Sequence, residues 1–274
     1  MQRRVTACRQ ILWVCAGHAG RAIWKGKLHA IRSALRTRTR KKSLVSFYRR
    51  EFSGGSVRGG VRGVARAESA AREVVEAESK VLGHDQPDTL ETRNVLAMAL
   101  AHQGKVDEAE KEYREILRLR EKRLGPERPL TLLARHNVAM MLARQGDYTG
   151  AEKELREVSE IATRVLGPEH PTTLLYRFTL AGTLRDEGKY TEAEAEFRNV
   201  VQLRTKVLGG EHPGTLESEF GLAQTLKREH KMEEARDIAQ RLVALAPKAW
   251  GENHPMTQSV RRLCDSLQEK RPLQ

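Results

Sequence analysis

Histidine is the residue type in this sequence whose spacing first suggests chemistry, because a neutral imidazole is a common metal ligand. His170, His212 and His254 follow one another at a constant interval, their positions differing by 42 at each step. If each belongs to a separate structural unit, packed helices spaced roughly 8 to 10 Å apart separate it from the next, and the three cannot share an ion. We therefore interpret these histidines as structural and predict neither a metal site nor a cofactor.

Catalytic motifs are absent from the sequence. There is no phosphate-binding loop ending in Gly-Lys-Ser/Thr, no His-Glu-x-x-His and no Gly-x-Ser-x-Gly. Cys8, Cys15 and Cys264 form no metal-ligand pair, and so sparse and odd a set suits a reducing compartment. We predict a protein that is not an enzyme and has no catalytic residues.

The histidines belong to a stretch that the chain repeats. Its fullest copy is Leu166–Leu174, Leu-Gly-Pro-Glu-His-Pro-Thr-Thr-Leu. The proline at its centre recurs at the same interval as the histidines, as Pro87, Pro129, Pro171, Pro213 and Pro255. A fixed period of this length indicates a repeat protein in which each unit is one supersecondary element.

Each unit is predicted to contain two helices. The glycine of the stretch suits the left-handed position that ends a helix, and the proline four residues later suits the first turn of the next. A second break divides each unit at Gly104, Gly146 and Gly188, whereas His230 stands there in the last unit and predicts a looser hairpin. The composition, 31% charged and 5% aromatic, agrees with an all-helical chain.

Both helices carry apolar residues at constant offsets. In the first unit these are Leu90, Leu96, Ala97 and Leu100 on the first helix and Ala109, Tyr113 and Ile116 on the second. At 100° per residue, each set forms one stripe along its helix. A single hairpin cannot bury such stripes by itself, so neighbouring units must stack.

The order of these residues resembles the tetratricopeptide repeat. The residues that carry the resemblance are Leu96-Ala97, Leu100, Gly104, Ala109 and Tyr113, and again Leu180-Ala181, Leu184, Gly188, Tyr190, Ala193 and Phe197. The 42-residue unit, longer than the usual unit of about 34, and its Leu-Gly-x-x-His-Pro loop are similar to the kinesin light chain type. The resemblance implies an all-α fold, a right-handed alpha-alpha superhelix (a tetratricopeptide repeat solenoid) of stacked antiparallel helix pairs.

The predicted array covers residues 66–270. It comprises a partial unit 66–83, units of about 84–125, 126–167, 168–209 and 210–251, and a capping helix 255–268. The partial unit keeps its second helix from Ala67, but the glycine run Gly54–Gly63, which should break any helix, replaces the first. The array therefore looks cut at its N-terminal end.

The segment 1–65 before the array is strongly basic. Residues 1–66 hold 17 Lys and Arg against one acid, Glu51, for a net charge of +16, whereas the remainder holds 32 against 35, for −3. Such a charge block predicts a disordered arm. The alternative is that Arg36–Lys42, with Phe47 and Tyr48 behind it, contacts a nucleic acid.

The arm also bears on localisation. Its apolar cluster Ile11–Ala16 resembles a secretory signal but is short, and His18 and Arg21 interrupt the chain directly after it. No stretch approaches the roughly 20 apolar residues of a membrane-spanning helix. We predict a cytoplasmic protein without a membrane span.

A second face of each first helix is the candidate binding site. In tetratricopeptide arrays this helix lines the concave surface, so the resemblance implies that these side chains point into the groove. The predicted groove residues are Asn94, Met98, His136, Asn137, Met140, Arg144, Phe178, Arg185, Phe220, Lys227 and Arg228. Phe178 and Phe220 are expected to be exposed and to need a partner to cover them. The alternative is that the methionines edge the core and the charges form a solvated face.

Three functions fit these observations. The first is a non-enzymatic interaction module that holds a partner peptide in the groove, with a modest preference for acidic segments bearing a large apolar residue. The second is the regulatory or sensor portion of a larger signalling system, suggested by the truncated first unit. The third, with nucleic acid as the less favoured partner, is association through residues 1–66.

Overall fold

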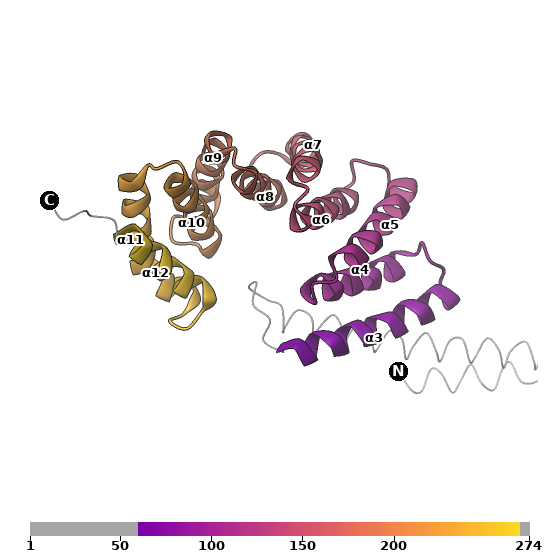
Figure 1. Cartoon of the computed structure of the whole chain (residues 1–274). Coiled ribbons are helices and arrows are strands. Elements are labelled where there is room, and N and C mark those ends of the chain that lie inside the picture. The colour runs from indigo at the N-terminus through magenta and orange to yellow at the C-terminus, as the bar shows by residue number, and fades with distance from the viewer. Residues whose placement is uncertain (1–59, 269–274) are drawn as a thin grey trace, which may run out of the picture. The chain divides into compact units, whose positions relative to one another are not determined.

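The computed structural model describes residues 60–268, and this part of the chain contains ten helices and no strand (Figure 1). The chain divides into two compact units, one ending at Gln103 and the other beginning at Gly104. The first unit contains α3 (Gly60–Val81) and α4 (Pro87–His102). The second contains α5 (Val106–Leu124), α6 (Pro129–Gln145), α7 (Tyr148–Leu166), α8 (Pro171–Glu187), α9 (Tyr190–Leu208), α10 (Pro213–Arg228), α11 (Met232–Trp250) and α12 (Pro255–Gln268).

Consecutive helices pack against each other within each unit. In the first unit α3 packs on α4, and in the second every helix from α5 to α12 packs on its successor. Helices that begin at a repeated proline, here called helices A, alternate with longer helices B along this series. This confirms the all-α fold of stacked antiparallel helix pairs.

The connection from each helix B to the next helix A depends on a glycine. Gly125 has φ 94° and ψ 164°, and Gly167 has φ 96° and ψ 157°. The sequence predicts the positive φ but not the ψ, which lies in the extended region reserved for glycine rather than in the left-handed helical one. The extended ψ directs the chain away from helix B and towards the proline that begins helix A.

Side chains of the same stretch close this loop. Thr131 Oγ1 donates to Gly125 O at 2.8 Å, and Thr215 Oγ1 donates to Gly209 O at 2.9 Å. His170 and His212 cap α8 and α10, since each Nδ1 accepts a backbone N–H two residues later at 3.1 Å. These capping bonds satisfy N–H groups that the first turn of a helix leaves without partners, which is a structural role.

The turn inside each hairpin uses the left-handed conformation. Gly146 (φ 87°, ψ 2°) and Gly188 (φ 92°, ψ 5°) adopt it, and His230 keeps the same turn with φ 64°. Ala235 and Ala239 of the last hairpin are fully buried. The substitution of glycine by histidine therefore leaves the turn geometry in place.

The N-terminal boundary differs from the expectation. α3 begins at Gly60, so it includes the end of the glycine run that should break any helix. Glycine lowers helix stability by about 1 kcal/mol per residue relative to alanine, which the helix-forming residues after the run can offset. The rest of the predicted arm, residues 1–59, lies outside the described residues.

Candidate functional site

Helices A adjoin one another along one side of the second unit. His136 Nε2 of α6 lies 3.0 Å from Thr179 Oγ1 of α8, and Lys227 Nζ of α10 donates to Ser266 Oγ of α12 at 2.7 Å. α8 and α10 pack on each other directly, and Arg185 of α8 also donates a hydrogen bond to Gln224 of α10. We call the outer side of α6, α8 and α10 the helix A face. The residues on this face are Leu130, Leu133, Asn137, Met140 and Arg144; Leu175, Thr179, Gly182, Arg185 and Asp186; and Glu217, Gln224, Lys227 and Arg228.

Three predicted groove residues of α6 lie on this face. Met140 is 40% exposed, Arg144 is exposed and Asn137 is half-buried. Their spacing of three and four residues keeps them on one side of the helix. Asn137, Met140 and Arg144 therefore form a continuous stripe that a partner could reach.

His136 does not reach this surface. Only 4% of it is exposed, and its ring lies against that of Tyr176 with 5.0 Å between the ring centroids. Burial lowers the pKa of His136 to about 4, so the imidazole is neutral at pH 7. The prediction that His136 lines the groove is wrong because Tyr176, from the next helix A, covers it.

The expectation that Phe178 and Phe220 are exposed aromatics is also wrong. Both are half-buried and pack against the core formed by Phe197 and its neighbours. The Phe178 ring meets Phe197 edge-on at 5.7 Å between centroids, and the Arg204 guanidinium lies over Phe178, 4.8 Å from the ring centroid. Residues of this chain thus supply much of the cover that was expected from a partner.

The predicted cationic residues lie on the face, but two are held by neighbouring helices. Arg185 Nη1 donates to Gln224 Oε1 at 2.8 Å and its Nε donates to Asp186 Oδ1 at 2.9 Å, while Lys227 is bound to α12 as described above. Arg228 is exposed. These side chains give the face its charge, and those of Arg185 and Lys227 also join neighbouring helices.

The remaining predicted residues, Asn94 and Met98, belong to α4 in the first unit. Both are half-buried, and Asn94 Nδ2 lies 3.6 Å from Met98 Sδ. This weak contact joins side chains one turn apart on the same helix. The two residues are thus neighbours on α4, in the first unit.

Sequence reasoning missed two leucines of the face. Leu130 is 51% exposed and Leu175 is 40% exposed. Glu91 and Glu217 occupy the position of Leu175 in other copies of the repeat, and an acidic residue in equivalent copies marks a solvent-facing position. Comparing the copies position by position would have identified Leu175 as a surface residue.

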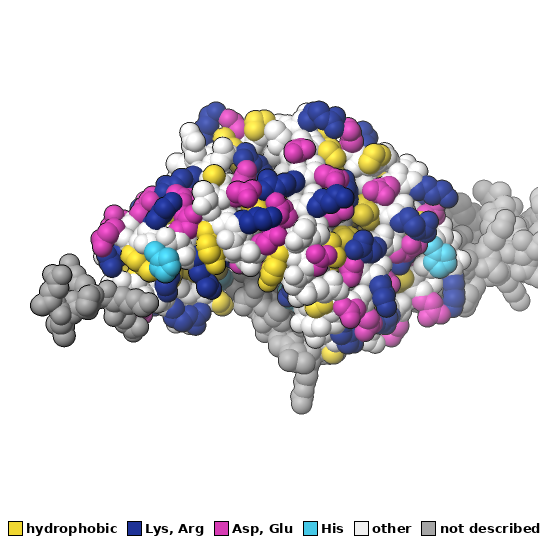
Figure 2. Space-filling view, turned by 45° about the horizontal axis from the view of Figure 1, so that its top comes forward, with side chains coloured by type: hydrophobic (Ala, Val, Ile, Leu, Met, Phe, Trp, Pro, Cys, Tyr) yellow, Lys and Arg dark blue, Asp and Glu magenta, His cyan; other side chains and the backbone are white. Residues whose placement is uncertain are grey.

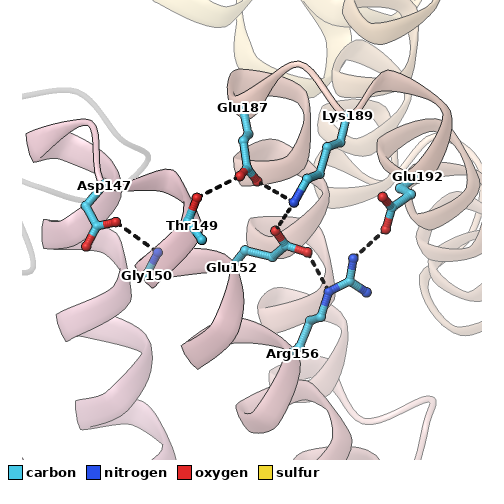
Figure 3. Close-up of polar contacts among 8 residues, drawn as sticks. All are labelled: Asp147, Thr149, Gly150, Glu152, Arg156, Glu187, Lys189 and Glu192. Atoms are coloured by element: carbon cyan, nitrogen blue, oxygen red, sulfur yellow. Dashed lines mark hydrogen bonds and ion pairs between the residues drawn. The ribbon is translucent and has the colours of Figure 1, made fainter.

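The outer sides of helices B present charges that are largely paired. Glu152 of α7 accepts hydrogen bonds from Arg156 Nε at 2.7 Å and from Lys189 Nζ at 2.6 Å, and Arg156 also contacts Glu192 of α9 (Figure 3). Although burial raises the pKa of Glu152, the bonds from Lys189 and Arg156 outweigh it and lower the pKa to about 2. The same arrangement recurs in the next repeat around Glu194.

Basic and acidic side chains are intermixed over the surface drawn in Figure 2, with hydrophobic side chains scattered among them. Within residues 60–268 no group of three or more His, Cys, Asp or Glu side chains could hold a metal ion. No helix in that part is both long and apolar enough to cross a bilayer. Charged side chains of both signs thus dominate this view of the described residues, and exposed apolar side chains on α6 and α8 include Leu130, Met140 and Leu175.

Comparison with known proteins places this geometry in a family. A tetratricopeptide repeat model matches residues 64–122, 88–141 and 175–248, and a second tetratricopeptide repeat model matches residues 131–172. None of the curated proteins matches the sequence closely enough to count as a relative.

Solved structures agree with the family match. A Podosopora anserina protein designated a kinesin light chain, with nearly identical TPR-like repeats, is 26% identical, with a TM-score of 0.62. The match covers 78% of this chain and 96% of that one. BtubC (BKLC) from P. vanneervenii is 17% identical with a TM-score of 0.65, over 75% of this chain and 83% of its own, and shows the fold alone.

Proposed function

The chain belongs to the tetratricopeptide repeat family, and from this premise we propose that it is a non-enzymatic interaction module that binds an extended segment of a partner protein along the helix A face. Repeat arrays bury their cores between neighbouring repeats, and successive repeats together form one extended exposed surface. Because a fold alone does not define a function, the proposal rests on what that surface carries.

The observation that carries the proposal is a difference between two surfaces. On helices B, Glu152, Arg156 and their equivalents satisfy one another. On the helix A face, Leu130, Met140 and Leu175 are exposed along the length of the helices. The other exposed large apolar residues of the second unit lie only in the last turns of helices B; they are Leu124, Val165, Val207 and Leu208. Exposed apolar side chains gathered on one surface commonly mark an interaction site.

The charge of the face suggests the chemistry of the partner. The face carries Arg144, Arg185, Lys227 and Arg228 against two acids, Asp186 and Glu217. The excess of positive charge would attract an acidic segment, and salt would weaken this attraction because the charged groups are near solvent. We therefore expect a modest preference for acidic segments that bear a large apolar residue.

The test is a titration of the full-length chain with arrayed twelve-residue peptides of varied charge and apolar content. Replacing Met140 by Asp and Arg228 by Glu changes one apolar and one cationic residue of the face, and should weaken binding about tenfold or more, as loss of a central interface side chain does. Lys153→Glu, on the exposed surface of α7, is the charge-matched control and should bind like the parent. Equal binding by all of these proteins would place the partner site elsewhere.

The two other functions gain no support from residues 60–268. Nucleic acid binding concerns the arm, most of which lies outside these residues, and the regulatory role depends on a further chain. Both stay predictions from the sequence, as does the cytoplasmic location. An electrophoretic shift assay with and without residues 1–59 tests the first of them, since phosphate-driven binding should weaken steeply with salt.

A further inference from the structure

The ends of helices B carry a second set of exposed apolar side chains. In the second unit these side chains lie in the last turns of α5, α7 and α9, and each of them is between 38% and 44% exposed. They are Leu124, Val165, Val207 and Leu208, and the half-buried Trp250 ends α11 in the same way. We call these five residues the helix B end row.

The row is continuous because neighbouring connections touch each other. Arg164, in the last turn of α7, contacts Glu127 of the connection between α5 and α6, with 2.7 Å between Nη2 and Oε1. Lys206, in the last turn of α9, contacts Glu169 of the connection between α7 and α8 in the same way. Each pair joins the end of one helix B to the connection of the preceding repeat. The apolar residues beside these pairs therefore follow one another along a single edge of the unit.

The fold does not require apolar side chains at these positions. Arg123 of α5 stands one repeat before Val165 and two before Val207, and all three are exposed. A cation in the last turn of a helix also interacts favourably with the negative end of the helix dipole, a benefit that valine does not provide. Exposed apolar side chains that follow one another along one edge commonly mark an interaction surface.

The charge along this edge is balanced. The stretches 121–129, 163–171, 205–213 and 247–255, which contain the row and its connections, carry six Lys and Arg against five Asp and Glu, a net charge of +1. Each stretch has a cation before its glycine and an acid after it. An edge with so small an excess of either sign does not attract a strongly charged partner and does not repel a copy of itself.

We propose that the helix B end row is a contact between two copies of this chain, related by a two-fold axis so that the two rows run antiparallel. One apolar end per repeat is a spacing that a second copy shares and that an unrelated partner does not. In the register that pairs all four helix ends of the second unit, Val165 of one copy lies opposite Leu208 of the other, and Leu124 lies opposite Trp250. The two-fold axis makes each of these contacts twice. The inference does not depend on the proposed function, whose test uses other residues.

Sedimentation equilibrium of the full-length chain between about 1 and 100 μM, a range that spans a micromolar Kd, tests the contact. The parent should pass from monomer to dimer in this range. Val165→Lys combined with Leu208→Lys removes two apolar contacts and places like charges opposite each other, so it should raise the Kd of the dimer about tenfold or more. Met140→Lys combined with Leu175→Lys makes the same changes at equally exposed positions of the helix A face, and should dimerise like the parent.

A second variant tests the antiparallel register at the same two positions. Val165→Lys combined with Leu208→Glu places opposite charges against each other in both copies of the contact. It should therefore dimerise about tenfold more tightly than the variant with two lysines, because like charges across an interface are costly and opposite charges are not. Equal Kd values for these two variants would show that Val165 and Leu208 do not face each other, and the antiparallel contact would be wrong.

Other results would also overturn the proposal. A parent that stays monomeric over the whole concentration range excludes a second copy as the occupant, and if Trp13→Asp then makes it dimerise, the apolar cluster Ile11–Ala16 of the arm covers the row instead. A dimer that the Met140→Lys, Leu175→Lys control weakens equally lies on the helix A face. Thermal midpoints of both row variants well below that of this control would show that Val165 and Leu208 support the fold rather than a contact.

Discussion

Two neighbouring layers between repeats, one between α6 and α8 and one between α8 and α10, are filled at equivalent positions by different side chains. In the first layer Tyr176 of α8 is fully buried against Leu132, Val158 and Ala162. Its ring is tilted by 36° against that of His136. A large side chain from helix A therefore lies over a small residue, Ala162, of helix B.

The second layer reverses this arrangement. Arg204 stands one repeat after Ala162 and extends from helix B, with its guanidinium over the Phe178 ring. Ser218, the counterpart of Tyr176, accepts a hydrogen bond from Arg204 Nη1 at 2.8 Å, and Gly214 O accepts another at 2.7 Å. Here the large side chain comes from helix B and the small one from helix A.

The two layers show that the combined volume of the helix A residue and the helix B residue facing it is kept similar, although the residue type at each position changes. Interiors are packed to nearly constant density, so a large residue must meet a small one across each layer. Tyr176 with Ala162 and Ser218 with Arg204 are two solutions to that requirement. The repeats are therefore not interchangeable even though their backbones are alike.

The largest expected effect comes from emptying the first layer. Tyr176→Ser gives this position the residue found in the second layer while Ala162 stays small, and leaves a cavity that should lower the free energy of unfolding by about 3 to 5 kcal/mol. Chemical denaturation measures the loss. Tyr176→Phe is the control: it keeps the ring and removes a buried hydroxyl that has no partner within residues 60–268, so it should cause no loss.

Combining Tyr176→Ser with Ala162→Arg tests whether the two solutions can be exchanged. Ala162→Arg alone should overpack the layer and destabilise it. Together the two changes should recover at least about 1 kcal/mol relative to the sum of the single effects, because residues in contact couple. Simple additivity would contradict the exchange of volumes between helices.

A pH-dependent difference between the layers comes next in size. Burial lowers the pKa of His136 to about 4, whereas the unfolded chain titrates near 6.5. Because the folded pKa is the lower one, the unfolded state takes up the proton first, and stability falls as the pH drops from about 6.5 to 4, by up to about 3 kcal/mol.

His136→Phe copies Phe178 of the second layer and should remove this dependence. The measurement is the free energy of unfolding of both proteins at several pH values between 7 and 4. Glu152 and Glu194, whose pKa values are lowered to about 2, contribute stability that is lost as the pH falls below their usual range, and they do so in both proteins. Parallel curves for the two proteins would therefore rule out His136 as the source.

A smaller effect is expected from Arg204→Met in the second layer. Methionine keeps much of the volume but leaves Ser218 Oγ and Gly214 O without the guanidinium donor, at a cost of about 1 to 3 kcal/mol. Part of this loss is offset because a buried charge is removed. Arg198→Met, on the exposed side of α9, should change stability by about 0.5 kcal/mol at most.

The fold was predictable because its signals are local and repeated. Gly125 permits a backbone conformation that other residues avoid, Pro129 begins a helix and Thr131 closes the loop, and the same three types recur in each later repeat. Each copy supports the same interpretation, so a decayed copy is still recognisable. The start of α3 was missed because helix formers after Gly60 outweigh the signal of the glycines.

The burial of the predicted groove residues was less predictable than the fold. The spacing along α6 and α8 groups His136 and Phe178 with the predicted groove positions, but it does not show what covers them. The covering groups, Tyr176 and Arg204, come from other helices in each case. These contacts depend on how neighbouring helices stack. Only a comparison of each large residue with its small counterpart in the other repeats could have indicated which side chains provide the cover.

The smallest expected effect distinguishes a glycine required by packing from one that is not. Gly182→Ala in α8 adds a methyl group to open space and should raise the free energy of unfolding by about 0.5 to 1 kcal/mol, because alanine favours the helix. Gly221→Ala in α10 brings a Cβ within 2.5 Å of the Phe197 ring, which must shift, so the same change should destabilise the protein. Thermal unfolding of both variants beside the parent measures the difference, and a loss of stability in Gly182→Ala would show that the space over α8 is filled by this chain itself.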